Sequence, residues 1–331
     1  MERSPREAGI DVSVVIATFN RRDMVARCLS ALALQDFGGR FEVVVVDDGS
    51  TDGTDALIAG LVRTYPVRLS YHRQGNRGVA AARNVGLGVA QGDIIAFLDD
   101  DHVPTGTWIR DICRPLADSA VGGVSGRGRA VAGPSLISRY LCLHRAHEAP
   151  QIENGEVLYL VTGNSAFRRE VVEQVGPFDE RFASFFRGVA PGGEDTEFSL
   201  RIRQRGYRLA YDPSAVTDHH QKTSFKVVMK ERFNFGVNRV LWYRIEGRPL
   251  DLLALAGQAF LMICSLLKWP LYARRYRRQG AGLLESAVFP LIDKLSETVY
   301  HLGAISGAFR IRRLIRLPEG QIRGSQGPAP G

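Results

Sequence analysis

The first hundred residues alternate short apolar strand patterns with amphipathic helix patterns, and no other feature constrains the fold as strongly. Expected strands cover residues 12–17, 41–46, 67–72 and 94–98, and the runs 12–17 and 41–46 are almost entirely apolar. Strands buried on both faces of a parallel sheet show such continuous apolar runs. The intervening segments predict helices, and Asn20 is expected to cap the first of them. The pattern predicts the βαβαβαβ half of a doubly wound, nucleotide-binding α/β sheet.

Beyond residue 101 the expected strands are shorter and glycines are more frequent, which predicts a sheet that is mixed in its second half. Helices are expected over residues 107–116, 136–147 and 194–205, and strands over residues 157–161 and 207–211. We expect residues 1–11 to be an N-terminal extension. Residues 12–220 are expected to form one globular domain.

Basic charge is concentrated in the C-terminal third of the chain. Residues 221–331 carry 18 basic and 7 acidic side chains, whereas the net charge of the whole chain is +8. The basic residues flank apolar runs and do not alternate with aromatics, so an anionic membrane surface fits better than nucleic acid. A solvated basic surface is the alternative.

Residues 252–267 are uncharged and are followed by Trp269 and a cluster of four arginines at 274, 275, 277 and 278. A spanning helix needs about 20 apolar residues, so an interfacial or re-entrant helix is favoured, with a true span or a buried core helix as alternatives. We expect residues 221–316 to be a helical, basic, membrane-associating appendage, and residues 317–331 to be a disordered tail. Since residues 12–17 are too short for a signal-peptide core, we expect a cytoplasmic protein, peripheral or monotopic on the inner face of the membrane.

Carboxylates follow two of the predicted strands, at the edge where an open α/β sheet binds its ligands. Asp47 and Asp48 follow the second strand, and Asp99, Asp100 and Asp101 follow the fourth. Three adjacent carboxylates repel one another unless a cation lies among them, although a solvent-exposed acidic turn is the alternative. The chain has neither a G-x-G-x-x-G motif after its first strand nor a P-loop. We therefore expect a metal ion to hold any bound phosphate.

An ordered set of sequence blocks extends this pattern. They are Val12-Ser-Val-Val-Ile-Ala-Thr-Phe-Asn-Arg21, Val45-Val-Asp-Asp-Gly-Ser-Thr-Asp-Gly-Thr54, Asn76-Arg-Gly78 with Ala82-Arg-Asn84, Gly92-Asp-Ile-Ile-Ala-Phe-Leu-Asp-Asp-Asp101, Thr162-Gly-Asn-Ser-Ala-Phe-Arg168, Gly176-Pro-Phe-Asp-Glu180, Gly193-Glu-Asp195 and His219-His220. Together they resemble the signature blocks of inverting family 2 glycosyltransferases, over about residues 12–248. The resemblance implies the glycosyltransferase A fold, a nucleotide-sugar donor, and a divalent cation, Mn²⁺ or Mg²⁺. It divides the globular domain into a nucleotide-binding half, residues 12–101, and an acceptor half, residues 102–220.

The resemblance also implies roles for single residues on the nucleotide side of the site. Asp48 would contact the base and ribose, with Ala17 and Thr18 as the adjacent wall and Arg83 close to the nucleotide. Asp99 or Asp100 would contact the ribose. Asp101 and His219 would be metal ligands, with His220 as the alternative to His219.

On the acceptor side, the resemblance makes Asp195 the catalytic base. Its neighbour Glu194, together with Gly163 and Asn164, would line the acceptor side, and residues 187–193 would form a lid. Glu194 and Asp195 could instead only stabilise the start of a helix.

The chain lacks the Q-x-x-R-W block of processive polysaccharide synthases, so we expect transfer of a single sugar to a hydroxyl acceptor, lipid-linked, in glycan or cell-envelope polysaccharide biosynthesis. Two alternatives remain open. One is a catalytically silent scaffold of the same fold. The other is a sugar-phosphate nucleotidyltransferase, which the absence of a Gly-rich basic loop after the first strand disfavours.

Overall fold

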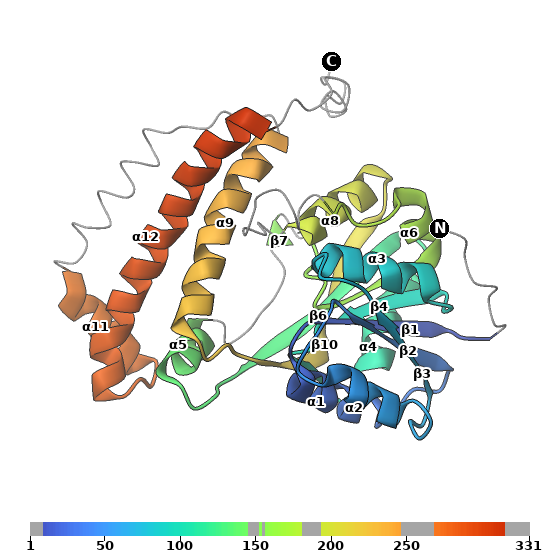
Figure 1. Cartoon of the computed structure of the whole chain (residues 1–331). Coiled ribbons are helices and arrows are strands. Elements are labelled where there is room, and N and C mark those ends of the chain that lie inside the picture. Colours follow the sequence, from blue (N-terminus) through green and yellow to red (C-terminus); the bar gives the residue numbers. More distant parts are fainter. Residues whose placement is uncertain (1–8, 145–151, 154–155, 181–192, 246–267, 315–331) are drawn as a thin grey trace, which may run out of the picture. The chain divides into compact units, whose positions relative to one another are not determined.

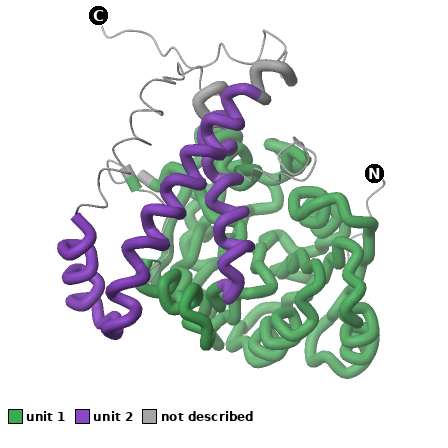
Figure 2. Tube along the Cα trace, turned by 60° about the vertical axis from the view of Figure 1, so that its left-hand side comes forward, with its two compact units in different colours: residues 1–221 green, residues 222–331 purple. Residues whose placement is uncertain are grey.

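The computed structural model describes residues 9–144, 152–153, 156–180, 193–245 and 268–314 (Figure 1). Contacts between Cα atoms divide the chain into two compact units, residues 1–221 and residues 222–331 (Figure 2).

The predicted βαβαβαβ half is present in the first unit. Its elements are β1 Val12–Thr18, α1 Arg22–Leu32, β2 Phe41–Asp47, α2 Thr54–Leu61, β3 Arg68–Arg73, α3 Val79–Val89 and β4 Ile94–Leu98. β1 pairs in parallel with both β2 and β4, and β2 pairs in parallel with β3. These pairings confirm the doubly wound arrangement.

Asn20 does not cap α1, so that prediction was wrong. Asn20 adopts a positive φ of 51°, and its side-chain oxygen accepts a hydrogen bond from the backbone N–H of Thr51. The backbone N–H of Arg22 at the start of α1 instead donates to Asp52 Oδ2 at 2.8 Å. The group that satisfies the helix start comes from the loop after β2, and a local sequence pattern cannot reveal such a contact.

The second half of this unit completes a mixed sheet. Its elements are β5 His102–Pro104, α4 Trp108–Cys113, the 3₁₀ helix η1 Arg114–Ala117, β6 Val121–Val131, α5 Leu136–His144, β7 Ile152–Glu153, β8 Glu156–Val157, β9 Asn164–Arg168, α6 Arg169–Val175, α8 Glu194–Gln204 and β10 Arg208–His220. The strand order of the large sheet is β3-β2-β1-β4-β9-β6-β10-β5, with β9 and β5 antiparallel to their neighbours. The predicted change to a mixed sheet is confirmed.

Two strand predictions in this half need correction. The strand expected over residues 157–161 is limited to β8, which pairs with β7, and β10 is far longer than the predicted 207–211. The sequence pattern predicts neither β6 nor β9. β6 is rich in glycine because its neighbours approach closely: a Cβ at Gly126 would lie 2.2 Å from the backbone oxygen of Ala215.

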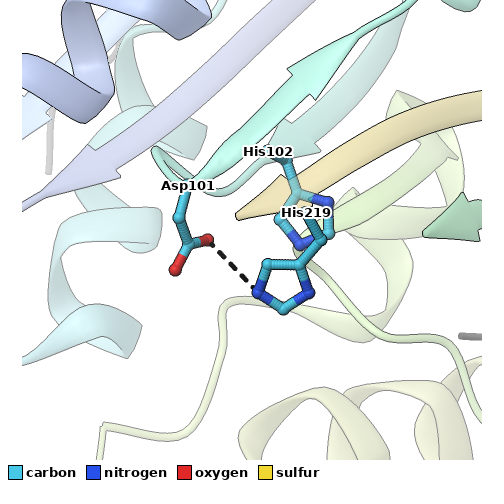
Figure 3. A group of neighbouring side chains, drawn as sticks. All are labelled: Asp101, His102 and His219. Atoms are coloured by element: carbon cyan, nitrogen blue, oxygen red, sulfur yellow. Dashed lines mark ion pairs between the residues drawn. The ribbon is translucent and has the colours of Figure 1, made fainter. Parts of the chain in front are cut away.

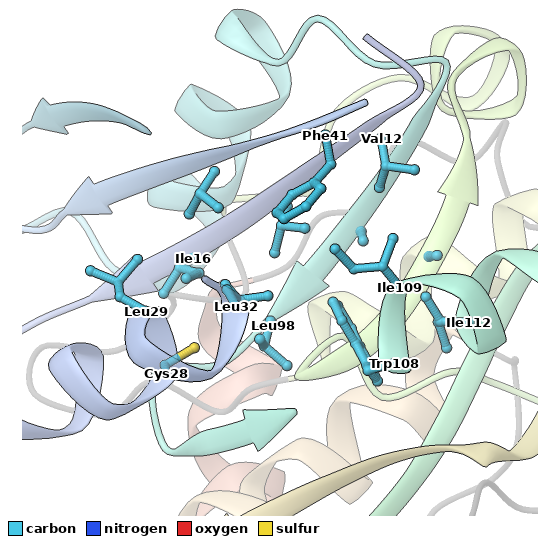
Figure 4. Packing of buried hydrophobic residues seen from close by; sticks show 14 of the residues in the cluster. Val12, Ile16, Cys28, Leu29, Leu32, Phe41, Leu98, Trp108, Ile109 and Ile112 are labelled. Atoms are coloured by element: carbon cyan, nitrogen blue, oxygen red, sulfur yellow. The ribbon is translucent and has the colours of Figure 1, made fainter. Parts of the chain in front are cut away.

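Two hydrophobic cores cover the two faces of the large sheet, and strand residues alternate between them. In β2, Val43 and Val45 belong to the core under α1 and α4, whereas Val44 and Val46 belong to the core under α3, α6 and α8. Figure 4 shows the first of these cores, where Trp108 packs beside the strands. The helices thereby fix the loops that follow each parallel strand.

The second unit contains α9 Phe225–Ile245, α11 Trp269–Arg278 and α12 Leu283–Leu314, and α9 and α12 lie side by side (Figure 1). Their backbones are close, because a Cβ at Gly236 would lie 1.9 Å from the backbone oxygen of Tyr300. Among the helices described, none has both the length and the apolar content needed to cross a membrane. The segment 252–267 lies outside the described residues.

Candidate active site

The carboxyl ends of several strands meet at one edge of the large sheet, because β1, β2, β4 and β10 run in the same direction. Thr18 ends β1 and Asp48 directly follows β2. Asp99 begins the acidic triplet after β4, and His219 is the second-last residue of β10. The sheet therefore gathers residues from both halves of the domain at this edge.

Arg21 holds two carboxylates of the acidic triplet together. Its Nη1 atom donates to Asp100 Oδ1 at 2.7 Å and to Asp101 Oδ2 at 2.8 Å. Thr18 Oγ1 donates to the other Asp100 oxygen at 2.7 Å. Burial raises the pKa of Asp100 to about 6, although Arg21 opposes this shift. Arg21 lies in the first of the sequence blocks, but the motif alone indicates no role for it.

Asp101, His102 and His219 form a compact cluster in which one potential ligand atom of each residue lies within 4.8 Å of the others (Figure 3). His219 Nε2 lies 3.8 Å from Asp101 Oδ1, and all three residues are buried. A carboxylate oxygen and imidazole nitrogens are suitable ligands for a divalent cation. The residues present thus fit the metal ion that the resemblance implies. His220 contributes its backbone N–H to the Asp101 backbone oxygen, and its ring is not a member of this cluster.

Arg83 connects the acidic triplet to the start of α8. This buried arginine of α3 donates from Nη1 to Glu194 Oε1 at 2.7 Å and from Nη2 to Asp99 Oδ1 at 3.0 Å. Its guanidinium carbon also lies 5.9 Å from the centre of the Phe178 ring. Arg83 is thus a buried cation shared by two carboxylates, the buried Glu194 and the partly exposed Asp99, and it compensates their negative charge.

Asp195 lies in the first turn of α8, where the helix dipole favours negative charge. The backbone N–H of Thr196 donates to Asp195 Oδ1 at 2.7 Å. Burial, followed by the adjacent Glu194 carboxylate, raises the pKa of Asp195 to about 7. A carboxylate with this pKa can accept and release a proton near neutral pH.

The Asp48 carboxylate fixes the turn that precedes α3. It accepts hydrogen bonds from Gln74 Nε2 at 2.7 Å and from the backbone N–H groups of Arg77 and Gly78, each at 2.8 Å. Ala17, the residue expected beside it, is partly buried near the end of β1. Asp48 therefore lies where the loops after two neighbouring strands meet.

Gly163 and Asn164 lie next to the start of the acidic triplet, because Asn164 of β9 pairs with Leu98 of β4. A Cβ at Gly163 would lie 2.6 Å from Asp99 Oδ2, so a larger residue would displace that carboxylate. Asn164 is buried and accepts a hydrogen bond from Trp108 Nε1 at 2.8 Å. Of the expected lid, residues 187–193, only Gly193 is among the described residues.

The site can therefore perform two chemical tasks. Asp195 offers a proton acceptor, and the cluster around Asp101 offers ligands for a cation. Arg83 connects these two parts. It bonds Glu194, the neighbour of Asp195, and Asp99, which belongs to the same acidic triplet as Asp101.

Comparison with known proteins identifies relatives over most of the chain. Residues 13–176 match the family Glycosyl transferase family 2. Glycosyltransferase AglE of Haloferax volcanii is 28% identical over 284 residues, which are 84% of this chain and 88% of AglE. The succinoglycan biosynthesis protein ExoM of Rhizobium meliloti is 28% identical over 299 residues, which are 87% of this chain and 94% of ExoM.

Among solved structures, the mannosyltransferase PcManGT from Pyrobaculum calidifontis in complex with GDP-Man and Mn²⁺ matches with a TM-score of 0.59 and 22% identity. The match covers 93% of this chain and 90% of that chain, and it confirms the predicted fold. The chain therefore belongs to glycosyl transferase family 2 and is a glycosyltransferase with the glycosyltransferase A fold.

Proposed function

We propose that the protein transfers a single sugar, with inversion at the anomeric carbon, from a nucleotide diphosphate sugar to a hydroxyl group of a lipid-linked acceptor, and that it requires Mn²⁺ or Mg²⁺. The observation that carries this proposal is the Arg83 bridge between Asp99, in the acidic triplet, and Glu194, next to Asp195. This bridge supports a single site that contains both a proton acceptor and the carboxylates expected at the donor.

In the proposed reaction Asp195 accepts the proton of the acceptor hydroxyl. The hydroxyl oxygen bonds to the anomeric carbon on the face opposite the diphosphate, while the bond from that carbon to the diphosphate oxygen breaks. The pKa of about 7 at Asp195 supports this role, because a general base works best when its pKa is near the operating pH.

Asp101 and His219 are the residues that would hold the divalent cation, which supplies positive charge to the leaving diphosphate when bound. Arg21 holds the second oxygen of the Asp101 carboxylate, so that Oδ1 faces His219. The GDP-Man and Mn²⁺ in the PcManGT complex support a nucleotide-sugar donor and a cation. ExoM, a succinoglycan biosynthesis protein, supports a place in glycan or cell-envelope polysaccharide biosynthesis.

The second unit supports membrane association and hence a lipid-linked acceptor. α12 exposes a row of apolar side chains, Leu284, Leu291, Leu295, Leu302 and Phe309. Their separations of 7, 4, 7 and 7 residues place them on one face of the helix. The four arginines of α11 are also exposed, and each basic residue near an anionic surface contributes about 1 kcal/mol to binding.

A donor screen tests the proposed reaction. Full-length protein is incubated with UDP- and GDP-linked sugars, with Mn²⁺, Mg²⁺ or chelator, and with lipid extracts as acceptor, and nucleoside diphosphate release is measured. We expect release to require the cation and NMR of the product to show an inverted anomeric centre. Asp195→Asn should abolish most turnover, whereas Glu194→Gln should cost less. A retained configuration, or equal rates with chelator, would contradict the proposal.

Vesicle sedimentation tests membrane association separately. Binding to anionic vesicles should weaken at high salt but persist, because the apolar row of α12 is insensitive to screening. Failure to bind anionic vesicles at low salt would refute this part and leave the transfer reaction standing.

A further inference from the structure

We infer that His102 is a third protein ligand of the divalent cation, beside Asp101 and His219, and that this set prefers transition-metal ions to Mg²⁺. The inference rests on the metal dependence proposed above. It adds a residue that the sequence motifs did not indicate and narrows the identity of the cation.

The pairing of β5 with β10 brings His102 to the metal site. His102 and His219 are direct partners in this antiparallel pair, so their side chains project from the same face of the sheet. Their rings stack with centroids 4.2 Å apart and planes 23° from parallel (Figure 3). Since Asp101 precedes His102 in the chain, one short segment and one strand supply all three side chains.

A chain of buried hydrogen bonds fixes the orientation of the His102 ring. The Trp108 indole can only donate, so Asn164 accepts with Oδ1 and directs its Nδ2 to Thr217 Oγ1 at 3.1 Å. Thr217 Oγ1 in turn lies 2.8 Å from His102 Nδ1. A hydroxyl oxygen has two lone pairs and can accept from both Asn164 and His102. The tautomer with a proton on Nδ1 leaves Nε2 as the nitrogen for a metal ion, and metal-binding histidines are commonly held by such a bond from their other nitrogen.

The donor set favours some cations over others. Mg²⁺ prefers an octahedron of oxygen ligands and loses water reluctantly, whereas imidazole binds first-row transition metals, with Co²⁺ above Mn²⁺. Two imidazoles and one carboxylate should therefore bind Co²⁺ most tightly, then Mn²⁺, then Mg²⁺. A site with Asp101 and His219 alone would discriminate less.

Electron paramagnetic resonance of Mn²⁺ tests this inference on the full-length protein, without turnover. Mn²⁺ is titrated alone and then with UDP or GDP, and competition with Co²⁺ and Mg²⁺ gives the order of affinity. Pulsed measurements count the nitrogen couplings to bound Mn²⁺. His102→Asn should weaken Mn²⁺ binding at least tenfold, remove one nitrogen coupling and reduce the preference for Mn²⁺ over Mg²⁺. Thr217→Val should weaken binding roughly tenfold by releasing the ring.

His72→Asn on β3 is the matched control and should bind Mn²⁺ as the wild type does. Circular dichroism and thermal unfolding verify that each variant is folded. Unchanged affinity and nitrogen couplings in His102→Asn, together with loss of binding in His219→Asn, would overturn the inference while leaving the proposed metal-dependent reaction intact. If the wild type binds no Mn²⁺ with either nucleotide, both the inference and the metal dependence fail.

Discussion

Replacing Arg83 with glutamine should move the pH dependence of turnover to higher pH. Burial and Glu194 raise the pKa of Asp195, Arg83 lowers it, and the resulting pKa is about 7. With this pKa, roughly one tenth of Asp195 is ionised at pH 6 and roughly nine tenths at pH 8, so wild-type turnover should rise about tenfold between them. Without the guanidinium, the hydrogen bonds from Thr196 are the lowering effects that remain, so the pKa of Asp195 should be higher. The protonated, inactive form of Asp195 should then persist to higher pH.

The assay measures initial rates at saturating donor from pH 5.5 to 9, together with the nucleotide dissociation constant of each variant. Arg208→Gln is the control, because Arg208 forms an exposed ion pair with Asp118 at the other end of β10. It should leave the midpoint unchanged. If Arg83→Gln weakens nucleotide binding but keeps the wild-type midpoint, Arg83 acts on the nucleotide and not on the base. A wild-type rate that is flat from pH 6 to pH 8 would refute the assignment of Asp195.

Four further predictions concern single substitutions. Asp195→Asn should reduce turnover by about 10²- to 10⁴-fold while nucleotide binding, measured by calorimetry, stays nearly unchanged. Asp101→Asn should weaken cation-dependent binding of a nucleoside diphosphate more than Asp100→Asn does, and the reverse order in the same titration would exchange their roles. Gly126→Ala should lower the free energy of unfolding by about 1–3 kcal/mol, because its Cβ would overlap the Ala215 backbone oxygen. Gly60→Ala, at an exposed helix position with open space around it, should raise stability by about 0.5–1 kcal/mol in the same denaturation assay.

The parallel half of the fold could be predicted because β1, β2 and β4 are buried on both faces and therefore read as nearly continuous apolar runs. β4, for example, has the bounds 94–98 that the sequence indicated. β6 could not be found in this way. Glycine disfavours strands, so the glycines of β6 hide it from a sequence pattern. They are needed because residues distant in the sequence, such as Ala215, approach the strand closely.

The candidate site shows the same division. The motif blocks include Asp101 and His219, but the proposed role of His102 depends on the pairing of β5 with β10, which no local pattern indicates. Likewise, Arg21 was visible in the first block, yet its contact with Asp100 joins residues 79 positions apart. The motifs indicate candidate residues for the site, and the tertiary structure shows how the charges of these residues are compensated.

The position of β10 in the sheet has a consequence for the order of folding. β10 lies between β6 and β5, so β5 has no neighbour in the large sheet until the chain has been synthesised through His220. Contacts between segments this far apart form late, because closing a long loop costs entropy before the contact is gained. A nascent or truncated chain that ends before β10 would contain the parallel strands β1 to β4 but would lack His219. Binding of the proposed cation would therefore report that β10 has been inserted into the sheet.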